Sequence, residues 1–124
     1  MKTRALSAAV ISLLMAACQS QTSKTQDFIP GTYVNFAKGD YAIANDTLLI
    51  TQLSDNNYQL IRKTTYQAIR NGKLLPKHHK TDKLVAVYDP QKLELDETTT
   101  GRVFRFDPDK HILLIKQASY QKIK

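Results

Sequence analysis

The sequence predicts an all-β fold, an antiparallel up-and-down meander that forms a small barrel or sandwich. Three observations lead to this fold class. Segments with alternating apolar and polar residues recur about every 8 to 12 residues, turn-forming residues separate them, and no segment of the mature chain has the apolar period of a helix. The segments number about eight or nine, which suits a single domain over residues 28–124.

The first strands are predicted between residues 32 and 53. The segment 32–36 (TYVNF) precedes a Lys-Gly-Asp turn signal, and the segment 47–53 (TLLITQL) precedes the polar run 54–57. The short polar side chains of that run (SDNN) favour a tight turn. This arrangement predicts strands joined by hairpins.

Residues 57–70 (NYQLIRKTTYQAIR) are predicted to form one long strand, because their Thr, Tyr and Ile side chains are poor helix formers. Tyr58, Leu60 and Tyr66 share one face. Arg62 falls on the same face, where an unpaired charge is costly, so its side chain needs a partner or a bulge. Two interpretations follow: a ligand-facing cation in a barrel mouth, or a bulge near Arg62 that turns it to solvent, which we favour.

Beyond the strong turn signal of Asn71-Gly72, the pattern continues to the end of the chain. Half-buried strands are indicated by KLVAVYD, KLELDE and RVFRFD, and the run HILLIK after the turn DPDK is more fully apolar. These strands and a short final one are predicted over residues 83–89, 92–97, 102–107, 111–116 and 119–124.

The N-terminus has the composition of a signal peptide, predicted over residues 1–17. Lys2 and Arg4 precede an uncharged, mostly apolar stretch, residues 5–17, which is too short to span a bilayer that needs about 20 residues. Residues 14–18 (LMAAC) resemble the lipobox of bacterial lipoproteins, with Met15 where Leu is usual. The resemblance implies that Cys18 is lipidated; the alternative is ordinary signal-peptide cleavage nearby, which leaves an odd thiol.

The residues after Cys18 bear on where the protein is held. Gln19 stands where an Asp retains many lipoproteins in the inner membrane, so the resemblance implies the outer membrane, and no acidic surface-export patch follows. Residues 18–27 form a polar tract with no apolar period and are predicted to be a flexible tether. We therefore expect a lipid-anchored protein of the bacterial cell envelope that faces the periplasm.

Several segments of the mature chain resemble a known group. The stretches IPGTYV, DTLLI, YQLIRKTTYQAIRNGK and YQKI are similar to those of small uncharacterised lipoproteins of Bacteroidota, and the Gly-Thr-aromatic opening is similar to that of lipocalin-like bacterial domains. In lipocalins an opening Trp plugs the closed end of the barrel. The resemblance implies that Tyr33 has this place here.

No pattern of a catalytic or metal site is present, so we expect neither an enzyme nor a cofactor. The chain has no G-x-S-x-G motif and no glycine-rich phosphate loop. Glu94 and Asp96 share a strand face, but they alternate with leucines as an exposed face does. His78 and His79 are adjacent and point to opposite sides of an extended chain, and His111 is distant, so no metal site is predicted and a solvated loop is favoured.

The chain is basic, with a formal net charge of +7. Without Lys2 and Arg4 it keeps 16 cationic and 11 acidic residues, a net charge of +5. Residues 72–83 (GKLLPKHHKTDK) form a predicted basic loop with a single acid. Its cations could contact anionic headgroups or an acidic protein partner, or simply keep a hairpin loop solvated; export and the lack of an aromatic stacking motif argue against nucleic acid.

Two functions are compatible with these features: a non-enzymatic binding or interaction module, or a structural accessory of a larger envelope machine such as a secretion or conjugation apparatus. A cavity lined by the barrel aromatics would favour the first, and a filled core with an exposed sheet edge the second. The candidate binding residues are Tyr58, Arg62, Tyr66, Phe104 and Phe106 on the sheet, and Lys73, Lys77, Lys80 and Lys83 in the basic loop.

Overall fold

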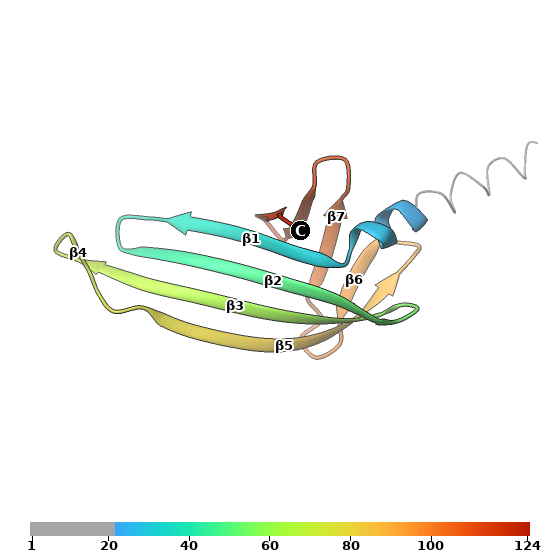
Figure 1. Ribbon diagram of the computed structural model, residues 1–124, viewed down its shortest axis with the longest axis horizontal. Helices are drawn as coiled ribbons and strands as arrows, with labels where there is room; N and C mark the ends of the chain where they lie inside the picture. Colours follow the sequence, from blue (N-terminus) through green and yellow to red (C-terminus); the bar gives the residue numbers. More distant parts are fainter. Residues whose placement is uncertain (1–21) are drawn as a thin grey trace, which may run out of the picture.

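The computed structural model describes residues 22–124, which form nine strands, all paired antiparallel (Figure 1). The signal peptide, Cys18 and the start of the predicted tether lie outside the described residues. The strands are β1 (Gly31–Lys38), β2 (Ala42–Ser54), β3 (Asn57–Arg70), β4 (Lys73–Leu74), β5 (His78–Asp89), β6 (Glu94–Glu97), β7 (Val103–Asp107), β8 (Ile112–Ile115) and β9 (Ala118–Lys122).

Eight of the strands close into a barrel. Each pairs with its neighbours in the order β2-β1-β9-β8-β7-β6-β5-β3, and the additional pairing of β2 with β3 joins the ends of this row. Among the described strands, the short β4 pairs with β3 alone and lies outside the ring. The predicted antiparallel meander is confirmed, and of the two predicted architectures the barrel is the one formed.

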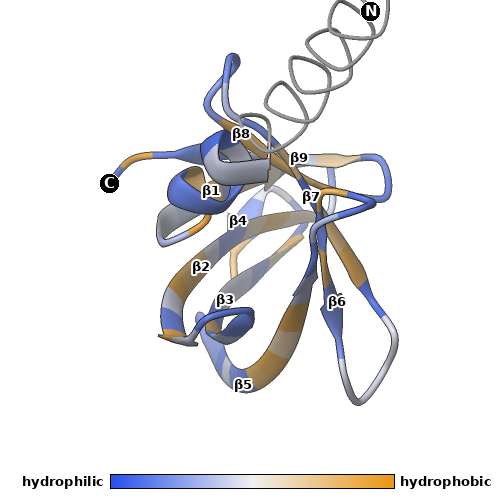
Figure 2. Ribbon diagram, turned by 90° about the vertical axis from the view of Figure 1, so that its right-hand side faces the viewer, coloured by the Kyte–Doolittle hydropathy of each residue, from blue (hydrophilic) through white to orange (hydrophobic). Residues whose placement is uncertain are grey.

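The barrel interior is filled by apolar side chains from alternate positions of the strands. Figure 2 shows this alternation as bands of opposite hydropathy along the ribbons. Fully buried side chains come from seven of the eight barrel strands and from Ile29, which precedes β1; the largest are Tyr33, Tyr58, Tyr88, Phe104, Ile29, Leu48, Leu60, Leu95 and Leu113.

Tyr33 closes one end of the barrel. Its side chain is fully buried, and its hydroxyl lies 2.9 Å from the carbonyl oxygen of Phe28 and 2.8 Å from that of Ile29. The rings of Phe28 and Phe106 pack against it edge to face, with centroids 5.9 and 6.0 Å away. Tyr33 is therefore part of the buried core at this end of the barrel.

A short helix over residues 22–28 lies against this closed end, where the sequence predicted a flexible tether and no helix. Contacts with the barrel stabilise it: Thr25 is buried, Lys24 pairs with Asp109 at 2.6 Å, and the Gln26 amide donates to the carbonyl oxygen of Asp55 at 2.7 Å. The tether prediction is therefore wrong for this part. Among residues 22–124, no helix is long and apolar enough to cross a membrane.

Four strands continue well beyond the barrel. Of the twelve residues of β5, only residues 86–89 pair with β6. Of the eight residues of β1, only Tyr33 and Val34 pair with β9. The far parts of β1, β2, β3 and β5 therefore form a four-stranded arm, seen at the left of Figure 1, which we call the basic extension (residues 36–45 and 63–83). Along β3, about 43 Å of strand separates its start beside the helix from its end at the tip.

The extension ends in tight turns, as the sequence predicted at Asn71-Gly72. Both residues have positive φ, 52° and 73°. The predicted basic loop, in contrast, is mostly strand: β4 includes Lys73, and β5 begins at His78. The loop prediction is therefore wrong for residues 78–83, because pairing with β3 keeps this segment extended.

Candidate functional site

The cavity of barrel aromatics that would favour a binding module is not formed by Tyr58, Phe104 and Phe106. Tyr58 and Phe104 are 0% and 1% exposed, and Phe106 packs against the same core. These three side chains fill the barrel, and a ligand cannot use the space they occupy. Tyr66 is separate from them, since it lies beyond the barrel mouth on the basic extension and is 45% exposed.

Arg62 lies at the barrel mouth, on the inward-facing side of β3 between Leu48 of β2 and Asp82 of β5. Its guanidinium pairs with Asp46: Nε lies 3.0 and 2.9 Å from the two carboxylate oxygens, and Nη2 lies 2.6 Å from Oδ2. The bulge favoured from the sequence is wrong. The register irregularity lies at Gln52/Ser54 instead, and Arg62 keeps its inward position because Asp46 neutralises it.

Asp46 is the centre of a buried hydrogen-bond network. Besides Arg62, the carboxylate accepts from the hydroxyl of Thr64 at 2.9 Å and from that of Tyr120 at 2.5 Å. Burial by itself would raise the pKa of Asp46, but these hydrogen bonds together outweigh it and hold the pKa below its usual value. Burial and the bond to Asp46 raise the pKa of Tyr120 to about 12. The Asp46 carboxylate therefore holds the Arg62 guanidinium in position, and Thr64 and Tyr120 hold the carboxylate in turn.

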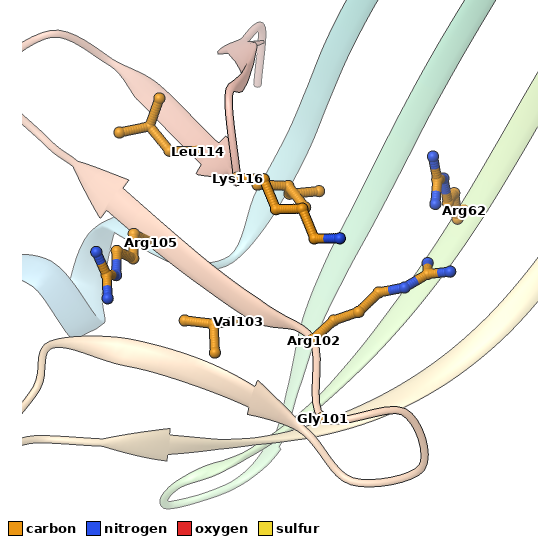
Figure 3. A pocket seen from close by; sticks show the side chains of 8 residues that line it. Arg62, Gly101, Arg102, Val103, Arg105, Leu114 and Lys116 are labelled. Carbon is orange, nitrogen blue, oxygen red and sulfur yellow. The ribbon is translucent and has the colours of Figure 1, made fainter.

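A pocket of about 600 Å³ opens beside Arg62, between β3 and the mouth ends of β7 and β8 (Figure 3). Arg102 and Lys116 extend toward the side on which Arg62 lies, whereas Arg105 lies at the other end of the pocket. The lining combines cationic and apolar side chains: Arg62, Gly101, Arg102, Val103, Arg105, Leu114, Ile115 and Lys116.

The cations of this pocket differ in whether an acid neutralises them. Nε of Arg105 lies 3.3 Å from Oε2 of Glu94, and Arg62 is paired with Asp46. Arg102 and Lys116 make no ion pair with any residue from 22 to 124. The pocket therefore holds two cations that remain available to a ligand.

The acidic strand β6 is less exposed than predicted. Glu94 was expected on an exposed face, but it is 4% exposed, because Arg105 of β7 lies across it and forms the ion pair. Asp96 is half-buried. Within the described part of the chain, no group of three or more His, Cys, Asp or Glu side chains is placed to hold a metal ion.

Charge is divided unequally between the basic extension and the barrel. The extension has seven cationic side chains against the two acids Asp40 and Asp82, whereas the other described residues have nine cationic and nine acidic side chains. The whole net charge of +5 therefore lies on the extension. Its cations are Lys38, Lys63, Arg70, Lys73, Lys77, Lys80 and Lys83.

The extension also exposes aromatic side chains. Phe36 is 64% exposed, and Tyr41, in the turn between β1 and β2, is 82% exposed. His78 and His79 lie on opposite faces of β5, beside Tyr66 and Thr65 of β3, as the extended spacing predicted. Exposed aromatic rings of this kind are enriched on surfaces that bind a partner.

One edge of the extension is unpaired within the described residues. From His78 to Leu84, β5 pairs with β3 on one side, and no described strand pairs with it on the other, because β6 begins to pair only at Ala86. The lysines on this segment, Lys80 and Lys83, limit edge-to-edge aggregation. They also give the edge its charge.

Sequence reasoning placed Arg62 in the barrel mouth as one alternative but missed its partners. The alternation of Asp46 with Leu48 and Ile50 puts the acid on the buried face of β2, and this signal predicts that it needs a cation. Arg102 and Lys116 carried no comparable signal, because their convergence depends on barrel closure. Comparison of the chain with protein-family models, curated proteins and solved structures gives no match.

Proposed function

We propose that this protein is a lipid-anchored lipoprotein of the bacterial cell envelope, facing the periplasm, that acts as a non-enzymatic interaction module. Its basic extension binds an acidic protein partner. The observation that carries this proposal is the charge division, since the extension holds the entire net charge of +5 and the barrel is neutral. Electrostatic complementarity of this kind speeds association and selects partners of opposite charge.

The position of the anchor favours a protein over membrane headgroups as that partner. Cys18 precedes the first described residue by four positions, a reach of at most about 14 Å. The helix 22–28 lies against the closed end of the barrel, and the tip of the extension is about 43 Å of strand away. A lipid on Cys18 thus holds the closed end at the membrane and leaves the tip to reach away from it.

The barrel itself supports a relationship to lipocalin-like domains. It has eight antiparallel strands, and the buried Tyr33 closes one end. In this proposal the barrel serves as a rigid base rather than a carrier, because its interior is filled by side chains such as Tyr58 and Phe104.

A second candidate function is that of a structural accessory in a larger envelope machine, such as a secretion or conjugation apparatus. The filled core favours it, together with the edge of β5 over residues 78–84, which no described strand pairs with. The two functions share the docking surface and differ in the size and permanence of the assembly.

Native electrophoresis of the protein, extracted from envelopes in mild detergent, tests the proposal. The test variant combines Lys73→Glu, Lys77→Glu and Lys80→Glu on the extension. A matched control combines Lys92→Glu, Lys110→Glu and Lys124→Glu, which are exposed on the barrel and change the net charge equally. We expect wild type and control to migrate in a complex that salt dissociates, and the test variant to migrate alone.

Two results would contradict the proposal. If all three forms migrate alone at low salt, the extension has no stable partner in the envelope. If the test variant stays in the complex, the partner docks elsewhere. A stable, salt-resistant assembly of high mass that still depends on the extension lysines would select the structural accessory over the interaction module.

A further inference from the structure

The pocket at the barrel mouth has features of a ligand site that is separate from the basic extension. We propose that it binds an organic oxyanion, that is, a carboxylate or phosphate group carried on an apolar body. Three features carry this inference: a cation fixed in place, two further cations that form no ion pair with residues 22–124, and an apolar wall.

Arg62 is the fixed cation. Its Nε and Nη2 atoms face Asp46, which Thr64 and Tyr120 hold from other directions. A guanidinium has five N–H donors, and the ion pair with Asp46 uses Nε and Nη2 of Arg62 but not Nη1. The group is therefore held rigid with donors left over, an arrangement that lowers the entropy cost of binding an oxyanion.

Arg102 and Lys116 supply the two further cations. They flank the mouth ends of β7 and β8, and their terminal groups extend toward the side of the pocket on which Arg62 lies (Figure 3). No ion pair within residues 22–124 holds either side chain. Glu97, which lies near Arg102, has its oxygens occupied by Thr99 and Thr100. An anion entering between these cations meets no free carboxylate of the lining.

The apolar wall argues for more than a bare ion. Val103, Leu114 and Ile115 line the same pocket, and its volume of about 600 Å³ is within the usual range for small-molecule sites. An inorganic anion would leave this wall in water. A ligand with an apolar body covers it and gains roughly 25 cal/mol for each Å² of apolar surface removed from solvent.

Methyl NMR of the full mature protein in a nanodisc of zwitterionic lipid tests the site. Hexyl phosphate and hexanoate are the oxyanion probes, hexylammonium is the control of opposite charge, and inorganic phosphate is the control without an apolar body. We expect the oxyanion probes to shift the methyl signals of Val103, Leu114 and Ile115 in a saturable way. The methyl signals of Leu49 and Val85, which point away from the barrel, should not move.

Two variants locate the interaction. Arg102→Gln with Lys116→Gln should weaken binding at least about tenfold, because charge-assisted hydrogen bonds are lost. The matched control, Lys92→Gln with Lys110→Gln on exposed turns of the barrel, should leave it unchanged. Equal binding of hexylammonium, or unchanged binding by the Arg102/Lys116 variant, would overturn the proposal.

The probes also separate the possible sources of the oxyanion. Tighter binding of hexyl phosphate than of inorganic phosphate supports a ligand with an apolar body, such as a lipid. Equal binding of the two phosphates would overturn the claim that the ligand has an apolar body and would indicate a free anion instead. The Lys73/Lys77/Lys80 variant of the basic extension should bind the probes like wild type, so the failure of one proposal is distinguishable from the failure of the other.

Discussion

The hydroxyl of Tyr120 donates to Oδ2 of Asp46 at 2.5 Å, although the two residues are 74 positions apart in the chain. Tyr120 lies on β9 and Asp46 on β2, and β1 separates these strands in the sheet. The bond therefore links the last strand of the barrel to the network that holds Arg62. The same hydrogen bond thus contributes to the stability of the barrel and to the position of Arg62 in the pocket.

Removing this hydroxyl should destabilise the barrel. Tyr120→Phe keeps the ring and loses a hydrogen bond to a buried carboxylate, so we expect the free energy of unfolding to fall by about 1.5–3 kcal/mol. Urea denaturation measures this free energy in the variant and in wild type. Tyr41→Phe is the matched control, since Tyr41 is 82% exposed and its change should have no measurable effect. Equal stability of the Tyr120→Phe variant and wild type would show that the bond contributes nothing.

The low pKa of Asp46 predicts a pH dependence of stability. Because the folded pKa lies below the unfolded value of about 3.9, the ionised carboxylate stabilises the fold above that pH, and the contribution is lost as pH falls through the folded pKa. Asp46→Asn should therefore be less stable than wild type at pH 7, and the difference should shrink below about pH 4. A difference that stays constant down to pH 2 would contradict the assignment.

Gly31 is predicted to tolerate no side chain. It has a φ of 148°, and a Cβ there would overlap the carbonyl oxygen of Lys124, which accepts a hydrogen bond from the amide of Thr32 at 3.0 Å. Gly31→Ala should lower the free energy of unfolding by roughly 2 kcal/mol and Tm by about 10 °C. Gly39→Ala is the control, because a Cβ there meets nothing closer than 4.0 Å. Equal Tm values for the two variants would contradict this account of β1.

The regular part of the fold could be predicted from the sequence, because strand period and turn residues are local signals. The long strand β3 and the turn at Asn71-Gly72 formed as predicted. The helix 22–28 could not be predicted, because contacts of Thr25 and Gln26 with the barrel end stabilise it rather than its own propensity.

The candidate site was less predictable, because its parts meet only through barrel closure. The pairing of Asp46 with Arg62 depends on the register between β2 and β3. The extension exists because β6 to β9 are shorter than β5 and β1, the strands on either side of them. The length of a strand can be predicted from the sequence, but the part of it that pairs with a neighbour cannot. Its charge, in contrast, was visible in the sequence around Lys73 and Lys77.

The anchor proposal predicts the effect of one substitution. Cys18→Ser removes the thiol that accepts the lipid, so the protein should stall in processing or leave the membrane fraction while its barrel folds normally. Membrane fractionation and gel migration measure the outcome, and protease resistance of the barrel is the control for folding. A variant that fractionates and migrates like wild type would contradict lipidation.

The most direct test of the central claim is photo-crosslinking in intact envelopes. A photoreactive amino acid replaces Tyr41 at the tip of the extension in one variant and Gln91, on an exposed turn of the barrel, in the other. Docking of an acidic protein on the extension predicts a protein adduct at position 41 that high salt abolishes, and none at position 91. Adducts with lipid alone at position 41, or equal protein adducts at both positions, would contradict it.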